Sequence, residues 1–171
     1  MDLNDQHSIS ATTCCTPAIR MTVLGIGNIL LGDDGAGIVV AESLRDELDA
    51  WGIDVVDGGT LSHSLLPIIE DCEGLVAIDA AQLHARPGTV KVFDGVAMDE
   101  YLLKRRSGTV HEVGLADLLD MARLRDALPG QRALVAVQPG RIGWGSELSP
   151  DVGRAIPAAA GEVRRLLEAW L

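Results

Sequence analysis

Apolar runs alternate with segments of helical spacing along most of the chain. The first run, MTVLGIG at Met21–Gly27, is stopped by glycines, which is typical of a strand buried on both faces. After it, apolar residues recur at helical spacing, with charged residues on the opposite face. These apolar residues are Val40, Leu44, Leu48 and Trp51. The pattern therefore predicts a buried strand followed by a helix that covers the sheet.

The same alternation continues toward the C-terminus. Strands are predicted at 53–59 and 74–80, with a helix at 61–72 between them. This order forms a βαβαβ unit, in which right-handed connections place the first strand beside both the second and the third. A helix at 113–128 and a last strand at 132–140 follow.

The segment between the third and the last predicted strand is less regular. GTVKVFDG at 88–95 alternates like a half-exposed strand. It follows the preceding strand too closely for a helical crossover, so we expect an antiparallel strand at an edge of the sheet. The stretch 95–110 is interpreted as irregular loops, and its basic residues Lys104, Arg105 and Arg106 suggest a role in partner choice.

A final helix is predicted to reach Trp170. Ser149 followed by Pro150 indicates an N-cap and a first helical position. Pro157 removes an amide donor inside the apolar stripe, which predicts a kink or a late helix start.

These elements predict one α/β domain of three layers. Its twisted, mostly parallel five-stranded sheet carries one antiparallel edge strand and is flanked by helices. A chain of 171 residues is long enough for one such domain and short for two. We expect the domain at 21–171 and a disordered tail at 1–20. Met21 stands directly before the first strand and is a candidate start of the native chain.

Composition and charge limit the classes of partner that the protein could bind. Hydrophobic residues make up 47% of the chain and charged residues 23%, and no apolar run reaches the ~18 residues that span a bilayer. The formal net charge of −11 repels a polyanion. We therefore expect a soluble protein without a membrane or nucleic-acid partner. Cys14, Cys15 and Cys72 lack metal or disulfide spacing, and no secretion signal precedes them, which favours the cytoplasm.

The stretch GIGNILLGDDGAG, 25–37, begins like a nucleotide-binding glycine loop. A dinucleotide site needs a third glycine that opens the helix, but Leu30 stands at that position. Asp33 and Asp34 would also repel a bound phosphate. Asp57, at the end of the second strand, would suit a ribose hydroxyl. A nucleotide-binding α/β protein is therefore kept as an alternative.

Carboxylates also gather where an open α/β sheet binds its ligands, beyond the carboxyl ends of the strands. The predicted topology places 28–35, 57–60 and Asp79 on that rim. Carboxylates suit a divalent cation, and an imidazole shifts the preference toward transition metals. His111, just before a predicted helix, could supply one. Asp34, Asp79 and His111 are thus the candidate metal ligands and catalytic residues.

Each candidate also has a simpler interpretation. Asp34 could cap the first helix. Asp79 could accept hydrogen bonds from loop amides, and His111 could be a capping or hydrogen-bonded histidine. No GxSxG turn or HExxH motif is present, and Ser62, His63 and Ser64, as consecutive residues, cannot form a catalytic relay by themselves.

Four blocks of the sequence resemble the nickel-iron hydrogenase maturation endopeptidases, in the order that this family shows. The blocks are LGIGNILLGDDGAG, VVDGGT, AIDA and HEVGLADLL. The resemblance covers Met21 to about Leu171 and implies a twisted, largely parallel sheet flanked by helices. It also implies that Asp34, Asp79 and His111 hold the family's nickel-contacting positions, the first of which varies between Asp and Glu.

The resemblance further implies an activity. An enzyme of this family cuts the C-terminal peptide from the large-subunit precursor of a nickel-iron hydrogenase after nickel insertion. The metal then arrives with the substrate, and the enzyme's own site is expected to be empty at rest. Nickel or a carboxylate would activate water, as in an aspartic-type endopeptidase. The non-enzymatic alternative is an accessory protein that checks nickel occupancy without hydrolysis.

Overall fold

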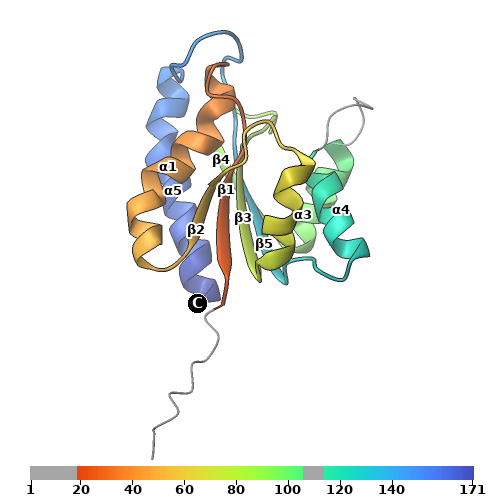
Figure 1. Ribbon diagram of the computed structural model, residues 1–171. Coiled ribbons are helices and arrows are strands. Elements are labelled where there is room, and N and C mark those ends of the chain that lie inside the picture. The colour runs from red at the N-terminus through yellow and green to blue at the C-terminus, as the bar shows by residue number, and fades with distance from the viewer. Residues whose placement is uncertain (1–18, 106–113) are drawn as a thin grey trace, which may run out of the picture.

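The five strands form one mixed sheet in the order β2-β1-β3-β5-β4 (Figure 1). The computed structural model describes residues 19–105 and 114–171. The strands are β1 (Met21–Gly25), β2 (Asp54–Asp57), β3 (Gly74–Ala80), β4 (Val90–Asp94) and β5 (Gln131–Val137). Neighbouring strands are parallel except for β4, which pairs antiparallel with β5 at the edge. The predicted sheet, its central first strand and its antiparallel edge strand are therefore confirmed.

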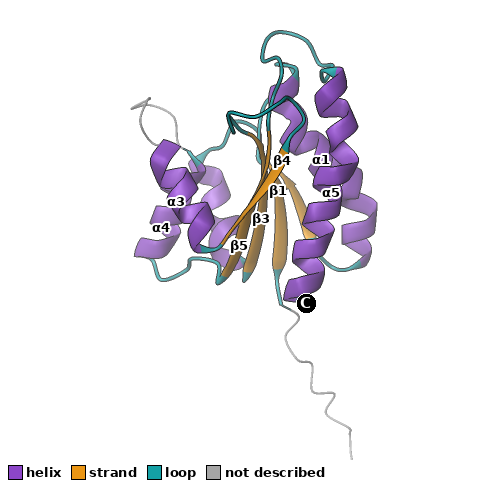
Figure 2. Cartoon of the chain, turned by 180° about the vertical axis from the view of Figure 1, so that it is seen from behind, coloured by secondary structure: helices purple, strands orange, loops and turns teal. Residues whose placement is uncertain are grey.

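Helices cover both faces of this sheet (Figure 2). One face carries α1 (Ala36–Ala50) and α5 (Pro150–Trp170), and the other carries α2 (Leu66–Asp71), α3 (Val96–Arg105) and α4 (Leu115–Leu124). Two short 3-10 helices, η1 (Asp33–Gly35) and η2 (His63–Leu65), precede α1 and α2. The three predicted layers are thus present in the described residues.

Two apolar clusters fill the spaces between the layers. Val23 and Val76 belong to the cluster under α1 and α5, while Leu24 and Leu75 belong to the cluster under α2, α3 and α4. This split follows from the two-residue period of a strand, which sends successive side chains to opposite faces. Both faces of β1 and β3 are buried, as their continuous apolar runs predict.

The prediction of irregular loops after Gly95 was wrong over Val96–Arg105, which form α3. Met98 is fully buried, and Leu102 packs against the same apolar cluster. A helix of ten residues that buries so few side chains has a weak periodic pattern of apolar residues, so its sequence does not indicate a helix clearly. It also starts directly after Gly95, the single residue between β4 and α3. Because Gly95 turns the chain with a φ of 53°, the sequence contains no loop that would mark the boundary between strand and helix.

Of the kink or late helix start predicted near Pro157, the late start was wrong. α5 begins at Pro150 and runs to Trp170 with Pro157 inside it. Its buried stripe lies on both sides of this proline, and it consists of Val152, Ala155, Ala159, Ala160, Val163, Leu166 and Leu167. Packing of that stripe stabilises the helix across the missing hydrogen bond.

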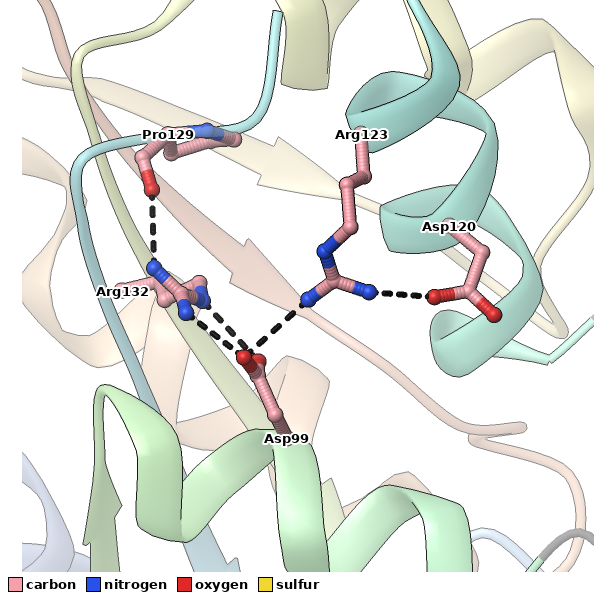
Figure 3. Close-up of polar contacts among 5 residues, drawn as sticks. All are labelled: Asp99, Asp120, Arg123, Pro129 and Arg132. Atoms are coloured by element: carbon pink, nitrogen blue, oxygen red, sulfur yellow. Dashed lines mark hydrogen bonds and ion pairs between the residues drawn. The ribbon is translucent and has the colours of Figure 1, made fainter. Parts of the chain in front are cut away.

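An ion-pair network ties α3 and α4 to the start of β5 (Figure 3). The Asp99 carboxylate accepts hydrogen bonds from Arg132 Nε at 2.9 Å and Nη2 at 2.6 Å, and from Arg123 Nη2 at 3.1 Å. Arg123 also pairs with Asp120, and Arg132 Nη1 donates to the carbonyl oxygen of Pro129. The Arg132 side chain is only 13% exposed, so this network is shielded from solvent in part.

Replacing Asp99 by asparagine should lower the free energy of unfolding at pH 7 by about 1–3 kcal/mol, because two arginines lose a charged partner. The hydrogen bonds and charge of Arg132 hold the pKa of Asp99 below its ordinary value. Its stabilising contribution is therefore complete above about pH 4 and is lost as the pH falls through the lowered pKa. The difference between wild type and variant should shrink below that pH in denaturant titrations. Glu42→Gln, which breaks an exposed pair with Arg45, should change little.

Gly37 sets the distance between α1 and the sheet. A Cβ at this position would lie 2.3 Å from the carbonyl oxygen of Ile78 and 2.4 Å from that of Ile26. Gly37→Ala should therefore lower the free energy of unfolding by about 1–3 kcal/mol. Gly161→Ala is the matched control, because a Cβ there meets nothing within 4 Å inside α5. The control should raise stability by up to about 1 kcal/mol, and an equal loss in both variants would contradict the proposed contact.

Candidate active site

The loop after β1 lies at the carboxyl edge of the sheet and joins the strands on either side. Ile26 N donates to the carbonyl oxygen of Ile78 at 2.8 Å, and Gly27 N donates to that of Gly59 at 2.8 Å. The first bond reaches β3, and the second reaches the turn after β2. The three segments that the topology predicted on one rim are therefore held together by backbone hydrogen bonds.

Asp34 folds back onto this loop. Its Oδ2 accepts a hydrogen bond from Asn28 N at 2.8 Å, and the residue is partly exposed. The N-terminus of α1 has no side-chain cap, so the interpretation of Asp34 as a helix cap was wrong. Gly27 permits the arrangement: its φ is 130°, and a Cβ there would lie 1.8 Å from the carbonyl oxygen of Asp34.

Four backbone N–H groups of the loop already have partners within the protein. Asn28 N binds Asp34, Leu30 N donates to Asn28 Oδ1, and Leu31 N donates to the carbonyl oxygen of Asn28. Gly32 N donates to the carbonyl oxygen of Gly145. A phosphate-binding loop instead aims its N–H groups at the ligand. This geometry argues against the nucleotide alternative.

Asp33 clamps the loop to the segment that follows β5. It is fully buried, and its Oδ2 accepts hydrogen bonds from Gly140 N, Arg141 N and Ser149 Oγ at 2.7–2.8 Å. Its Oδ1 accepts one from Ser149 N at 2.6 Å. Burial raises the pKa of Asp33, but these hydrogen bonds outweigh burial and hold the pKa below its ordinary value. Ser149 is the N-cap residue of α5, as predicted. Its hydroxyl donates a hydrogen bond to Asp33, however, and makes no capping bond to the helix.

The turn after β2 supports the loop from the other side. Gly59 has a φ of 49°, and its N–H donates to Asp57 Oδ1 at 2.8 Å. Gly58 N donates to the carbonyl oxygen of Gly25. A tight glycine turn therefore follows β2. This local hydrogen bond explains the Asp57 carboxylate as part of the turn, so a bound ribose is not needed to account for it.

Asp79 is the penultimate residue of β3 and lies opposite Ala136 of β5. It is partly exposed, whereas the five residues before it are buried. The short helix η1, which contains Asp34, packs against β3. The structure therefore places the segments that carry Asp34 and Asp79 next to each other at the rim.

His111 lies outside the described residues. Within residues 19–105 and 114–171, no group of three or more His, Cys, Asp or Glu side chains is arranged to hold a metal ion. α4 begins at Leu115 and leads through a short loop to the start of β5, so its N-terminus is directed toward the carboxyl rim. The set of Asp34, Asp79 and His111 stays a prediction.

Gln138 is a rim residue that sequence reasoning missed. It is buried directly after β5, and its Oε1 accepts hydrogen bonds from Leu83 N at 2.7 Å and Ala85 N at 3.3 Å. Its Nε2 donates to Gln82. Gln138 thus holds the chain at 82–85, shortly after it leaves β3. The only signal in the sequence was a polar residue at the end of an apolar strand.

The fold and its carboxylate-lined rim define an open α/β protein with a candidate catalytic edge, and comparisons with known proteins identify its family. The family model described as hydrogenase maturation protease matches residues 38–166. The hydrogenase expression/formation protein HupD of Rhizobium leguminosarum bv. viciae is 30% identical over 90% of this chain and 77% of its own length. The hydrogenase 2 maturation protease of Escherichia coli is 30% identical over 85% and 88%.

A solved structure agrees with these sequences. The hydrogenase maturating endopeptidase HybD from E. coli superimposes with a TM-score of 0.76 at 29% identity, covering 88% of this chain and 93% of its own. The chain therefore belongs to the hydrogenase maturation protease family, and it is a hydrolase of the peptidase class. Membership in this family favours peptide hydrolysis over both the accessory-protein and the nucleotide-binding alternatives.

None of the helices in the described part of the chain combines the length and the apolar character needed to cross a membrane.

Proposed function

We propose that this peptidase removes the C-terminal peptide from the large-subunit precursor of a nickel-iron hydrogenase after nickel has been inserted. The observation that carries the proposal is the position of Asp34. It lies on a loop that is hydrogen-bonded to β3 and to the turn after β2, at the rim where β3 presents Asp79. The family assignment supplies the reaction class, and the rim supplies carboxylates for it.

Nickel is part of the substrate in this proposal. Asp34 and Asp79 offer oxygen ligands and His111 a nitrogen ligand, a set that suits a divalent transition metal. The set contains no thiolate, so it should hold nickel weakly by itself. The precursor's own thiolates would complete the coordination, and the enzyme would gain affinity only for a precursor that carries the metal.

Held in this way, the nickel fixes the register of the precursor on the rim. Positioning of the scissile bond converts cleavage into an effectively unimolecular step. Nickel, or a rim carboxylate acting as a base, then activates water for attack on the peptide carbonyl. The rigid loop contributes by keeping the Asp34 carboxylate in place, since its Oδ2 is fixed by Asn28 N.

The test is an incubation of the purified chain with nickel-loaded and with nickel-free precursor, followed by intact-mass measurement. We expect loss of the C-terminal peptide from the nickel-loaded precursor alone. Equal cleavage of both precursors would show that nickel is not needed for recognition, although the peptidase activity on the precursor would stand. Nickel-dependent binding without any cleavage would support the accessory-protein alternative instead.

A further inference from the structure

Four large apolar side chains are exposed on two loops at the carboxyl rim. They are Ile29 (50% exposed), Leu30 (54%), Ile142 (56%) and Trp144 (87%), and we call them the rim platform. Large apolar side chains that are exposed together beside polar groups mark an interaction site more often than a solvent-facing surface. Trp144 is the most exposed of these large apolar residues in the described part of the chain.

The two loops that carry the rim platform are joined through their backbones. Gly32 N donates to the carbonyl oxygen of Gly145 at 2.6 Å, Gly145 N to that of Leu30 at 3.0 Å, and Gly143 N to that of Leu31 at 3.2 Å. Figure 1 shows both loops together above the carboxyl ends of the strands. Trp144 therefore lies between two residues that are each hydrogen-bonded to the other loop.

The buried carboxylate of Asp33 makes this pair of loops rigid. Its four hydrogen bonds fix the backbone at 140–141 and at Ser149, on either side of Trp144. A surface whose backbone is already fixed loses less conformational entropy when a partner binds. An exposed tryptophan on a fixed backbone has the properties of a binding anchor, since tryptophan is enriched among the residues that dominate interface energies.

The rim platform is next to the candidate active site. Ile29 and Leu30 directly follow Asn28, whose N–H binds the Asp34 carboxylate at 2.8 Å. A polypeptide bound at Asp34 would therefore lie close to the rim platform. We propose that the rim platform is the docking surface for an apolar segment of the hydrogenase precursor beside the bond that is cut, with Trp144 as its anchor. This inference rests on the proposed function and names the part of the site that binds the protein substrate.

A second copy of this chain is a poorer occupant than the precursor. Each chain has a formal net charge of −11, so a dimer would bring two strongly acidic molecules together. It would also cover the loop that carries Asp34. The precursor must reach this rim to be cleaved.

The test compares Trp144→Ala with Leu124→Ala, in the full chain. Leu124 is 85% exposed and ends α4 at the opposite edge of the sheet, so the two variants remove equally exposed apolar groups. Both should unfold at the temperature of the wild type. In steady-state cleavage of nickel-loaded precursor, Trp144→Ala should raise KM at least about tenfold and change kcat less than about twofold. Leu124→Ala should leave both constants unchanged.

Direct binding of the precursor separates the failure of this inference from that of the proposed function. If the wild type cleaves the precursor and Trp144→Ala binds and cleaves it equally well, the rim platform is not the docking surface, although the proposed function stands. If the wild type binds the precursor through Trp144 without cleaving it, docking is supported and the proposed function fails. A wild-type dimer that Trp144→Ala dissociates, with precursor binding unchanged, would assign the surface to a second copy.

Discussion

Asp79→Ala should reduce the cleavage of nickel-loaded precursor by about 10²–10³-fold, because one of three proposed ligands to the substrate's nickel is lost. The carboxylate lies at the rim end of β3, beside the segment that carries Asp34, so its removal should affect the proposed metal site and little of the core. Initial rates measured from the release of the C-terminal peptide give the result. Asp34→Ala should behave in the same way.

Two controls make this prediction specific. Asp94→Ala removes an exposed carboxylate from the end of β4, which is antiparallel and therefore ends at the opposite edge of the sheet. Its rate should equal that of the wild type. Asp34→Glu should retain more activity than Asp34→Ala, because it keeps a carboxylate that can still contact the proposed metal. Normal cleavage by Asp79→Ala would remove Asp79 from the site.

Asp33→Asn should lower the free energy of unfolding by roughly 2–4 kcal/mol. The Asp33 carboxylate is fully buried, and each of its four bonded partners is a donor. An asparagine must turn its NH₂ group toward one or more of these N–H or O–H donors, which leaves buried donors without an acceptor. Thermal unfolding should show the loss as a decrease in Tm of about 2–4 °C per kcal/mol in a domain of this size.

Ser149→Ala provides the graded comparison for Asp33. It removes the Ser149 Oγ bond to Asp33 and keeps the backbone bond from Ser149 N. The expected loss is about 0.5–1.5 kcal/mol, the usual contribution of a single hydrogen bond. If Asp33→Asn cost no more than Ser149→Ala, the clamp between the two rim loops would not stabilise the fold as we describe.

The centre of the sheet could be predicted from the sequence because β1 and β3 are nearly continuous apolar runs. β1 and β3 are buried on both faces, so apolar residues dominate both runs. Right-handed connections leave β1 few positions other than beside β2 and β3. The helix α3 could not be predicted, since Met98 is the one residue buried completely among its described positions 96–104, and no linker separates the helix from β4.

The candidate site could be predicted in part for a similar reason. Asp34 follows β1, and Asp79 lies at the end of β3. The carboxyl ends of these two parallel strands meet at one edge, so topology alone places the two residues near each other. The partners of Asp33 and Gln138 could not be predicted, because they lie more than fifty positions away along the chain: Gln138 binds Leu83, and Asp33 binds Ser149. Nothing in the local sequence of either polar residue identifies its distant partner.

X-ray absorption at the nickel edge tests the central claim most directly. Nickel-loaded precursor would be mixed with an excess of enzyme and frozen rapidly, and its spectrum compared with that of the precursor alone. We predict that wild-type enzyme adds oxygen and nitrogen ligands, including an imidazole that His111→Ala does not supply, and that Asp79→Ala adds fewer oxygen ligands. A nickel spectrum that the enzyme leaves unchanged while the same mixture releases the C-terminal peptide would contradict the account.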